Sequence, residues 1–379
     1  MKPILLNVDG ANPLGFLVAV GVVRLLSEKK GERAAPDVRL SWSESRRPAV
    51  LAQGVEDGAA LVGLIADLAS RPAPDVTAVE AEKGARSIFE EARRNERKKR
   101  DEIRKRHLPR DKRKEAMEAE HAPLATVAAG LRSEWRTARA KAAPDVTVSM
   151  GLDLNVNSEE FVEHCRDALD AATFLARRWV DFCACFGTEN ASERMAATPF
   201  ALISGSGHQH FLKTAGDLMV ACTTDHFRSA LLDTWAAKDD GSSFRWDPDD
   251  DRRYALLADD PTASGNKPKT IWGANRLAFE ALRLFPCMRA RTGPATVGWR
   301  HDVWRWPLWT CNLSPAVIST ILAGRDIWRD DPESRRRLRA RGVFAVFQTR
   351  RITVGRAPNQ KLNFTPSVPV WSSGASAGG

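Results

Sequence analysis

The spacing of apolar residues near the N-terminus predicts a strand that is followed by a buried helix. Residues 4–8 (ILLNV) form a short apolar run, which is typical of a strand. Residues 13–28 are apolar on nearly every side, and a helix of that kind lies inside a protein. Asn12 can cap this helix, and Pro13 suits its first turn, where the N–H that proline lacks would have no helical partner.

The apolar pattern continues with a second strand and a second helix. Residues 38–42 (VRLSW) predict the strand, and residues 48–70 predict the helix. Because strands and helices alternate in this part of the chain, we expect a small α/β unit over residues 1–82.

Residues 83–114 break this pattern with a long run of charge. They hold fifteen Lys or Arg against six Asp or Glu, a net of +9 that equals the surplus of the whole chain. The segment consists of strong helix formers with almost no apolar stripe, so it cannot form a core helix. We expect a protruding charged helix or hairpin that breaks near Pro109. The helical pattern of residues 115–143 extends it to a basic helical insertion over residues 83–143.

A basic chain with a pI near 9.4 favours an anionic partner, with nucleic acid first and an acidic protein or a membrane surface second. Lys and Arg that contact phosphates displace counterions without reading the bases. Charge runs are also commonly just solvated, so a solvated or partly disordered linker is the alternative. In this segment we expect phosphate contacts from Arg97, Lys98, Lys99, Arg100, Arg104, Lys105, Arg106, Lys112 and Arg113.

The remainder of the chain predicts a helix-rich domain over residues 144–371, ahead of a flexible Ser/Gly/Ala tail over residues 372–379. Apolar residues at helical spacing occur there between short β-like runs. We therefore expect a helix-rich α+β protein with small β-sheets and a charged helical insertion. The expected helices cover residues 158–186, 210–237, 274–285 and 315–323, and the expected strands cover residues 146–154 and 343–354.

Residues 299–309 interleave Trp with cations and predict a Trp-rich hairpin. Trp304 and Trp306 would share one face of a strand, while Arg305 would face the other way. Trp can stack on an unpaired base, but buried indoles more often anchor a core, so we expect the arginines rather than the rings to contact nucleic acid. The expected contacts from this part of the chain are Arg289, Arg291, Arg300, Arg305, Arg350 and Arg351, with Arg356 and Lys361 beside them.

Residues 205–210 (GSGHQH) are the first candidate for chemistry. A Gly-rich loop ahead of a helix can present backbone N–H groups to a phosphate, but this loop matches neither a Walker loop nor a dinucleotide fingerprint. His208 and His210 could ligate a metal, yet no third and fourth ligand stand at a useful spacing. A plain loop with one structural histidine is the simpler interpretation. A metal-dependent nuclease or accessory processing enzyme that uses His208 or His210 is the alternative.

The acidic residues and the cysteines do not predict a metal site. The acidic run at residues 247–251 lacks the mid-loop Gly and the closing Glu of a calcium loop. The six cysteines do not have the spacing of a zinc ribbon or finger, and reduced, buried thiols are typical of a cytosolic protein. We therefore predict no metal, no cofactor and no catalytic residue. The cysteines are Cys165, Cys183, Cys185, Cys222, Cys287 and Cys311.

The apolar stretches of the sequence are too short to predict a membrane-spanning helix. Spanning a bilayer needs about 20 apolar residues, and the longest apolar stretch is shorter than this and is interrupted by Gly and Arg. The N-terminus does not have the pattern of a signal peptide. We therefore expect a cytoplasmic protein without membrane contact.

Several phrases of the sequence resemble a known family. DGANPLGFLVAVGVVRLL followed by VRLSW is similar to the N-terminus of subunits from type I-G (formerly I-U) CRISPR systems, which serve in antiviral defence. DPDDDRRYALLADDP, GANRLAFEALRLFP and WRWPLW are similar to the later part of the same proteins. The resemblance implies a component like the large subunit of a Cascade-type ribonucleoprotein complex. Such a component would act without catalysis beside guide RNA and other CRISPR subunits, help to recognise target DNA, and support recruitment of a separate helicase-nuclease.

Overall fold

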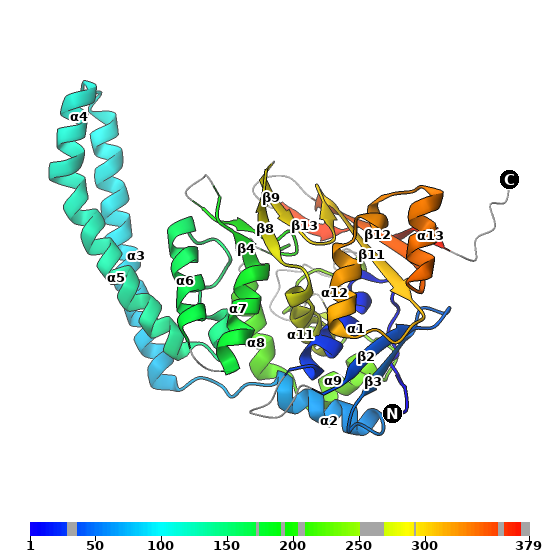
Figure 1. The fold of residues 1–379 in the computed structure, drawn as a ribbon. Helices are drawn as coiled ribbons and strands as arrows, with labels where there is room; N and C mark the ends of the chain where they lie inside the picture. Colours follow the sequence, from blue (N-terminus) through cyan, green and yellow to red (C-terminus); the bar gives the residue numbers. More distant parts are fainter. Residues whose placement is uncertain are drawn as a thin grey trace, which may run out of the picture. The chain divides into compact units, whose positions relative to one another are not determined.

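The computed structural model combines helices with several small β-sheets (Figure 1). Helix makes up 52% and strand 19%, so the α+β class predicted from the sequence is confirmed. The chain divides into two compact units: Pro72–Gly151, which we call the hairpin unit, and Met1–Arg71 with Leu152–Gly379, which we call the main unit. The residues that the structure describes are 1–28, 36–171, 174–190, 194–203, 209–250, 269–291, 293–354 and 360–372.

Helix α1 (Pro13–Leu26) lies in the core of the main unit, as its apolar pattern predicts. The Asn12 side chain caps it by accepting hydrogen bonds from the backbone N–H groups of Leu14 and Gly15 at 2.8 and 3.2 Å. Every residue of the helix except Arg24 is buried. The local sequence is therefore sufficient to predict where this helix starts and that it is buried.

Helix α11 (Trp272–Ala281) packs closely against α1. The contact depends on Gly21, because a Cβ atom there would lie 2.1 Å from the carbonyl oxygen of Leu277. Such a separation is far inside van der Waals contact, so only glycine allows the two helices to approach this closely.

We expect Gly21→Ala to push these helices apart and to lower the free energy of unfolding by about 1–3 kcal/mol, as overpacking of a core does. Urea denaturation followed by circular dichroism measures the change. Gly63→Ala is the matched control, because a Cβ at Gly63 meets nothing within 4 Å and alanine favours the helix. Equal stability of the Gly21→Ala protein and the wild type would contradict the close packing.

Three antiparallel strands form the N-terminal sheet, in the order β1 (Ile4–Leu5), β3 (Pro48–Ala52) and β2 (Val38–Trp42). The prediction of one helix over residues 48–70 is wrong at its start, because the first five of these residues pair with β2 along its whole length. Alternate positions of β3 are buried, and this period-2 pattern is short enough to be mistaken for part of the following helix.

The second helix, α2 (Gly58–Ala69), begins only after a turn. Gly54 has a positive φ of 79°, which turns the chain at the end of β3. The Asp57 side chain then caps α2 by accepting a hydrogen bond from the backbone N–H of Ala60 at 2.8 Å.

A five-stranded antiparallel sheet forms from the C-terminal third of the chain. Its first two strands make the predicted Trp-rich hairpin, and residues 343–354, where the sequence predicts one or two strands, form one. The last strand ends at Ser372, the first residue of the predicted tail, and residues 373–379 lie outside the described residues. The strands are β10 (Trp299–Arg300), β11 (Val303–Trp309), β12 (Val343–Val354), β13 (Lys361–Phe364) and β14 (Val368–Ser372), with β13 and β14 both paired to β12.

The tryptophans of β11 build the core between this sheet and α1. Trp304, Trp306 and Trp309 are fully buried, and the rings of all three lie within 6.4 Å of the Phe16 ring of α1. The indole N–H of Trp306 donates to the carbonyl of Gly10 at 2.8 Å. These rings anchor the fold and are not available to stack on bases.

Two predicted long helices are each divided into two in the structure. Residues 158–186 form α6 (Ser158–Asp170) and α7 (Phe174–Phe186). The chain leaves the helical conformation at Ala171, and neither Gly nor Pro marks this break in the sequence. The two helices pack against each other, and this tertiary contact cannot be predicted from the local sequence.

Residues 210–237 also form two helices, α8 (Phe211–Ala221) and α9 (Thr224–Leu231). Thr223 and His226 make a capping box at the start of α9, and this signal identifies the break. The strand predicted over residues 146–154 is wrong. The chain forms a 3-10 turn there instead, and the Asp145 side chain caps this turn by accepting a hydrogen bond from the backbone N–H of Thr147 at 2.9 Å. Most of the apolar side chains that suggested a strand are buried around this turn.

The remaining elements are short. The helix predicted over residues 315–323 is confirmed as α12 (Pro315–Ala323), and α13 (Pro332–Ala340) was not predicted. Three two-stranded ladders are formed by β4 (Gly187–Thr188) with β5 (Ala196–Ala197), β6 (Asp239–Asp240) with β7 (Lys269–Thr270), and β8 (Cys287–Ala290) with β9 (Gly293–Thr296).

A cluster of charges lies inside the main unit around Glu280, whose side chain is fully buried. Arg178 donates to both carboxylate oxygens at 2.6 Å, and Arg276 and Arg283 each donate once at 2.6 Å. Burial by itself raises the pKa of Glu280, but the three guanidinium charges outweigh burial and hold this pKa well below its usual range. Glu28 pairs with Arg178 and Arg283, so the cluster joins the end of α1 to α7 and α11.

The hairpin unit consists of two long antiparallel helices, α3 (Val76–Lys105) and α5 (Ala122–Ala142). The short helix α4 (Arg110–Ala116) and a π-helical turn (Met117–His121) connect them. The chain breaks between α3 and α4 at Pro109, as predicted.

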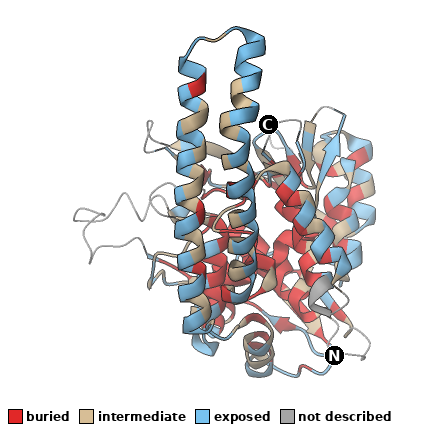
Figure 2. Cartoon of the chain, turned by 90° about the vertical axis from the view of Figure 1, so that its left-hand side faces the viewer, coloured by how far each residue is buried: buried red, intermediate tan, exposed pale blue. Residues whose placement is uncertain are grey.

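The two long helices bury only a narrow stripe, and most of their surface is exposed (Figure 2). The rings of Phe89 and Trp135 stack at 5.4 Å, and the indole N–H of Trp135 donates to Glu82 at 2.7 Å. Ile103 is fully buried nearer the turn. A thin apolar seam of this kind fixes which side of α3 faces α5, and thereby which side faces solvent.

Candidate nucleic-acid interface

Five cations share one exposed side of α3: Arg94, Arg97, Lys98, Arg104 and Lys105. Each residue of an α-helix advances by about 100°, so this spacing places all five within an arc of about 120°. The arc lies opposite the buried stripe. We call these five residues the outer face of α3.

No cation of the outer face has a hydrogen bond or ion pair with any residue in the described part of the chain. One acid, Asp101, lies among them at this level of the helix. Five like charges without partners on one helix repel one another, and this repulsion decreases when an anion binds. The outer face is therefore a surface with the charge and the access that a polyanion needs.

Three of the other predicted cations have internal partners instead. Arg106 donates to both carboxylate oxygens of Glu120 at 2.6 and 2.9 Å, and Lys99 donates to the same carboxylate at 3.3 Å. These hydrogen bonds lower the pKa of Glu120, with Arg106 contributing most. Arg100 pairs with Glu96 at 3.8 Å. Arg106 and Lys99 thus hold α3 to the π-helical turn, and Arg100 pairs within α3, so all three are less available to a ligand than the outer face.

The π-helical turn positions the acids for these contacts. It brings Glu120 opposite α3 and places His121 so that its Nε2 lies 2.5 Å from Glu96 Oε1. A π-turn adds one residue to a helical turn and shifts the residues that follow it, which is how such turns re-aim side chains. In α4, Lys112 and Arg113 are exposed, and the Arg113 side chain donates to the carbonyl of Leu108 at 3.3 Å.

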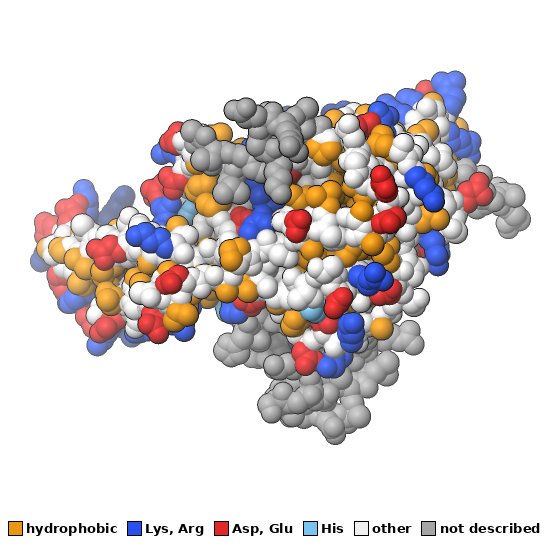
Figure 3. All heavy atoms as spheres, turned by 90° about the horizontal axis from the view of Figure 1, so that it is seen from below, with side chains coloured by type: hydrophobic (Ala, Val, Ile, Leu, Met, Phe, Trp, Pro, Cys, Tyr) orange, Lys and Arg blue, Asp and Glu red, His pale blue; other side chains and the backbone are white. Residues whose placement is uncertain are grey.

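Acids on either side of residues 83–114 reduce the charge of the hairpin unit as a whole. Residues 72–151 contain nineteen Lys or Arg and fourteen Asp or Glu, a net of +5. Figure 3 shows acidic and basic side chains intermingled over the hairpin in the view from below. The unit is therefore less basic than residues 83–114 alone, and the position of the unpaired cations matters more than their number.

A second basic surface lies on the main unit around Trp328. The guanidinium carbons of Arg300 and Arg305 lie 4.9 and 5.0 Å from the centre of the Trp328 ring. Arg305 also donates to Gln348 at 3.0 Å, and burial lowers the pKa of its guanidinium. The two guanidinium groups stack on the same indole ring, and each has further N–H groups that can donate hydrogen bonds to an anion.

The strand register adds Arg350 to this surface. Arg300 faces Val303 across β10 and β11, and Val303 faces Arg350 across β11 and β12. Directly opposed residues of an antiparallel sheet point to the same face, so Arg350 shares the face of Arg300. Arg351 points to the other face and pairs with Asp302 at 2.7 Å, which separates it from this surface.

Trp328 was not predicted as part of a site. It lies in the 3-10 helix Arg325–Trp328, and Arg325 and Arg329 beside it are exposed. The interleaving of Arg with Trp, which drew attention to residues 299–309, is also present here and could have identified it. Arg94 was likewise missed in the prediction, although its helical spacing from Arg97 and Lys98 places it on the outer face.

Other predicted cations lie on β8, at the turn after it and on β13. Arg291 is exposed at the turn between β8 and β9, and Arg289 is exposed on β8. Lys361 begins β13, and Arg356 lies outside the described residues.

The histidine candidate has a structural role at the start of α8. His210 Nδ1 lies 2.5 Å from an oxygen of Asp153, and the other oxygen accepts from the backbone N–H of Phe211 at 2.7 Å. His208 lies outside the described residues. Within the ranges that the structure describes, no three His, Cys, Asp or Glu side chains gather in a way that could hold a metal ion.

Asp247 of the acidic run has a structural role, and Cys222 is one of the buried cysteines. The Asn12 amide donates to Asp247 at 3.0 Å, so Asp247 supports the cap of α1. All six cysteines are free thiols. Burial raises the pKa of the Cys222 thiol to about 12, which leaves it protonated and unreactive at neutral pH.

Comparison of the chain with protein-family models, with curated proteins and with solved structures found no match in any of the three. Among the described helices, none combines the length and the apolar character needed to cross a bilayer. The two basic surfaces are therefore the features that bear on function.

Proposed function

We propose that this chain binds nucleic acid through the phosphate backbone, with the outer face of α3 as the main contact. The observation that carries the proposal is the set of five exposed cations without partners in the described part of the chain. A phosphate backbone is a regular array of negative charge, and a straight helix face with cations at successive turns can follow it. Contacts with phosphates position the protein on the nucleic acid but do not distinguish one base sequence from another.

The surface around Trp328 is the proposed second contact. Its arginines come from the sheet and are held in place by the ring, so they offer fixed donors to a phosphate. The sequence resemblance to type I-G CRISPR subunits supports placing the protein in a Cascade-type ribonucleoprotein complex. The nucleic acids would then be guide RNA and target DNA, and the protein would serve binding rather than catalysis.

The direct test is the salt dependence of binding by the full-length wild-type protein. We expect measurable affinity at 25 mM KCl for fluorescein-labelled 20-mers of single-stranded RNA, single-stranded DNA and duplex DNA, measured by fluorescence anisotropy. The logarithm of the affinity should fall linearly with the logarithm of the salt concentration. Three to five phosphate contacts predict a slope of about −3 to −4.5 on duplex DNA and about −2 to −3.5 on single strands.

Two results would contradict the proposal. One is the absence of binding to all three probes at 25 mM KCl, and the other is a slope shallower than about −1, which corresponds to a single contact. If the basic surfaces instead bind an acidic protein, complexes purified from cells would survive nuclease treatment unchanged.

A further inference from the structure

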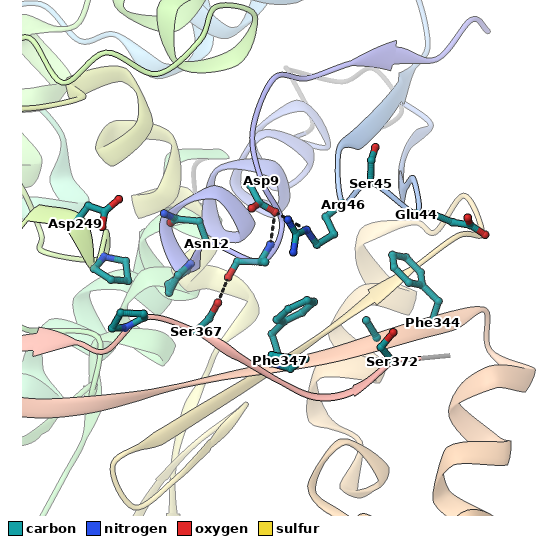
Figure 4. A pocket seen from close by; sticks show the side chains of 16 residues that line it. Asp9, Asn12, Glu44, Ser45, Arg46, Asp249, Phe344, Phe347, Ser367 and Ser372 are labelled. Carbon is teal, nitrogen blue, oxygen red and sulfur yellow. Dashed lines mark hydrogen bonds and ion pairs between the residues drawn. The ribbon is translucent and has the colours of Figure 1, made fainter. Parts of the chain in front are cut away.

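A large open cleft on the main unit is independent of both basic surfaces. Its volume is about 990 Å³, at the upper end of the range for ligand sites in proteins. Its walls come from the loop before α1, the turn between β2 and β3, the start of β12 and the segment leading into β14 (Figure 4). Residues far apart in the sequence thus converge on one concave surface.

The floor of the cleft is apolar and firmly held. Phe344 is half-buried, and the ring of Phe347 stacks on the buried Trp306 at 6.2 Å. The Ser367 hydroxyl donates to the carbonyl of Ala11 at 2.5 Å, which ties the wall near β14 to the loop before α1. An apolar floor of this kind can take an aliphatic or aromatic side chain.

The rim of the cleft carries two exposed carboxylates. Glu44 and Asp249 are exposed, and neither has an ion pair with any described residue. They lie at opposite ends of the cleft in Figure 4, with the phenylalanines between them. The cation of the cleft, Arg46, is already bound to Asp9 at 3.2 Å. The free charge of the cleft is therefore negative at both ends.

Backbone pairing at β14 is an unsuitable way to bind there. Pro369 lies within β14, and Pro366 lies just before it, so this edge has positions without an N–H donor. Proline on an edge strand blocks the addition of a further strand. A ligand is therefore not expected to add a strand at β14, which leaves side-chain contacts as the main means of recognition along this wall.

We propose that this cleft binds an extended segment of another protein in which an apolar side chain lies between two Lys or Arg residues. The apolar side chain packs on Phe344 and Phe347, and the two cations pair with Glu44 and Asp249. Charge complementarity selects this occupant, because free carboxylates at both ends repel a phosphate backbone and attract a basic peptide. The cleft is thus a protein-binding site, distinct from the proposed nucleic-acid contacts.

The test uses an array of fluorescent nonapeptides and the full-length protein. In each peptide two lysines flank a Leu-Pro-Leu or Leu-Phe-Leu centre at a separation of three to six residues, and each has a twin with glutamates in place of the lysines. We expect the protein to bind at least one lysine peptide and to bind its glutamate twin at least tenfold more weakly. The variant Glu44→Lys/Asp249→Lys should lose about tenfold in affinity for the lysine peptide and prefer the glutamate twin.

The matched control is Glu56→Lys/Asp233→Lys, which changes the net charge equally at two exposed acids outside the cleft. It should bind the lysine peptide as the wild type does. Phe344→Ser should weaken binding of both charge types, since it removes the apolar contact. Circular dichroism and thermal denaturation confirm that each variant is folded.

Three outcomes would overturn the proposal. They are failure of every lysine peptide to bind better than its twin, equal loss of affinity in the control variant, and self-association of the wild type that the Glu44→Lys/Asp249→Lys change abolishes. The last outcome would identify a second copy of this chain as the occupant. The peptide measurements need no nucleic acid, so their result stands whether or not the proposed nucleic-acid function holds.

Discussion

Alanine at all five positions of the outer face is expected to weaken binding to a 20-base-pair duplex about 500-fold at 0.1 M salt. Each cation that neutralises a phosphate contributes about −0.9 to the slope of log affinity against log salt. If three of the five make such contacts, their loss reduces the slope by about 2.7, which corresponds to about 500-fold at this salt concentration. Fluorescence anisotropy over a range of KCl concentrations measures both the affinity and the slope.

We expect the five alanine substitutions to leave the fold and its thermal stability unchanged. The five side chains have no partners among the described residues, and alanine is the best helix former. The matched control replaces five exposed cations of the main unit, spread over its surface, so that the net charge falls equally. A comparable loss of affinity in the control would mean that overall charge, rather than the outer face, drives binding. The control positions are Lys2, Arg47, Arg166, Arg177 and Arg228.

Glu280→Gln is expected to lower the free energy of unfolding of the main unit by about 3–5 kcal/mol, the typical effect of removing one partner from a buried ion cluster. The carboxylate accepts hydrogen bonds from Arg178, Arg276 and Arg283, and all of these groups are almost completely shielded from water. Glutamine would leave three guanidinium groups close together with only Glu28 to balance them. Chemical denaturation monitored by tryptophan fluorescence measures the loss.

The control for this prediction is Glu333→Gln. Glu333 pairs with Arg336 and Arg337 on the exposed surface of α13, where an ion pair contributes at most about 1 kcal/mol. A Glu280→Gln protein as stable as the Glu333→Gln protein would show that the cluster is dispensable. If Glu280→Gln does not fold, then Glu280→Leu combined with Arg178→Met should recover part of the stability, since it removes charge from both sides of the pair.

The same cluster predicts how stability depends on pH. The pKa of Glu280 is lower in the folded protein than in the unfolded chain, so the unfolded chain binds more protons. The contribution of Glu280 is therefore fully present above the unfolded value of about 4.3 and is lost as the pH falls towards the folded value. Chemical denaturation of the wild type should show that the free energy of unfolding decreases as the pH falls from 7 to 3. In the Glu280→Gln protein, the free energy of unfolding should depend less on pH over the same range.

Local sequence is a good guide where one segment contains its own structural signal. Helix α1 is predictable because Asn12, Pro13 and an all-round apolar pattern occur together. The break at Pro109 is predictable because proline cannot continue a helix, and the Trp-rich hairpin because its strands alternate. The break at Ala171 has no such signal, and it was missed.

The candidate site shows the same limit more sharply. The sequence identified residues 83–114 as the basic segment, but it could not separate the cations of the outer face from those that pair with Glu120. Arg106 and Glu120 are fourteen residues apart, so their contact exists only because α5 returns along α3. The cleft near Phe344 likewise joins segments from opposite parts of the chain, and the surface around Trp328 brings Arg300, Arg305 and Trp328 together from separate elements.

By itself, the sequence determined the α+β class, the buried first helix, the basic helical segment and the Trp-rich hairpin. Each follows from backbone preferences and from the period of apolar residues, which are properties of neighbouring positions. Only the tertiary structure decided which cations are free, which are paired, and where a concave surface forms. Ion pairs and clefts depend on which distant side chains packing brings together, and the free energy that selects those partners is not contained in any single segment.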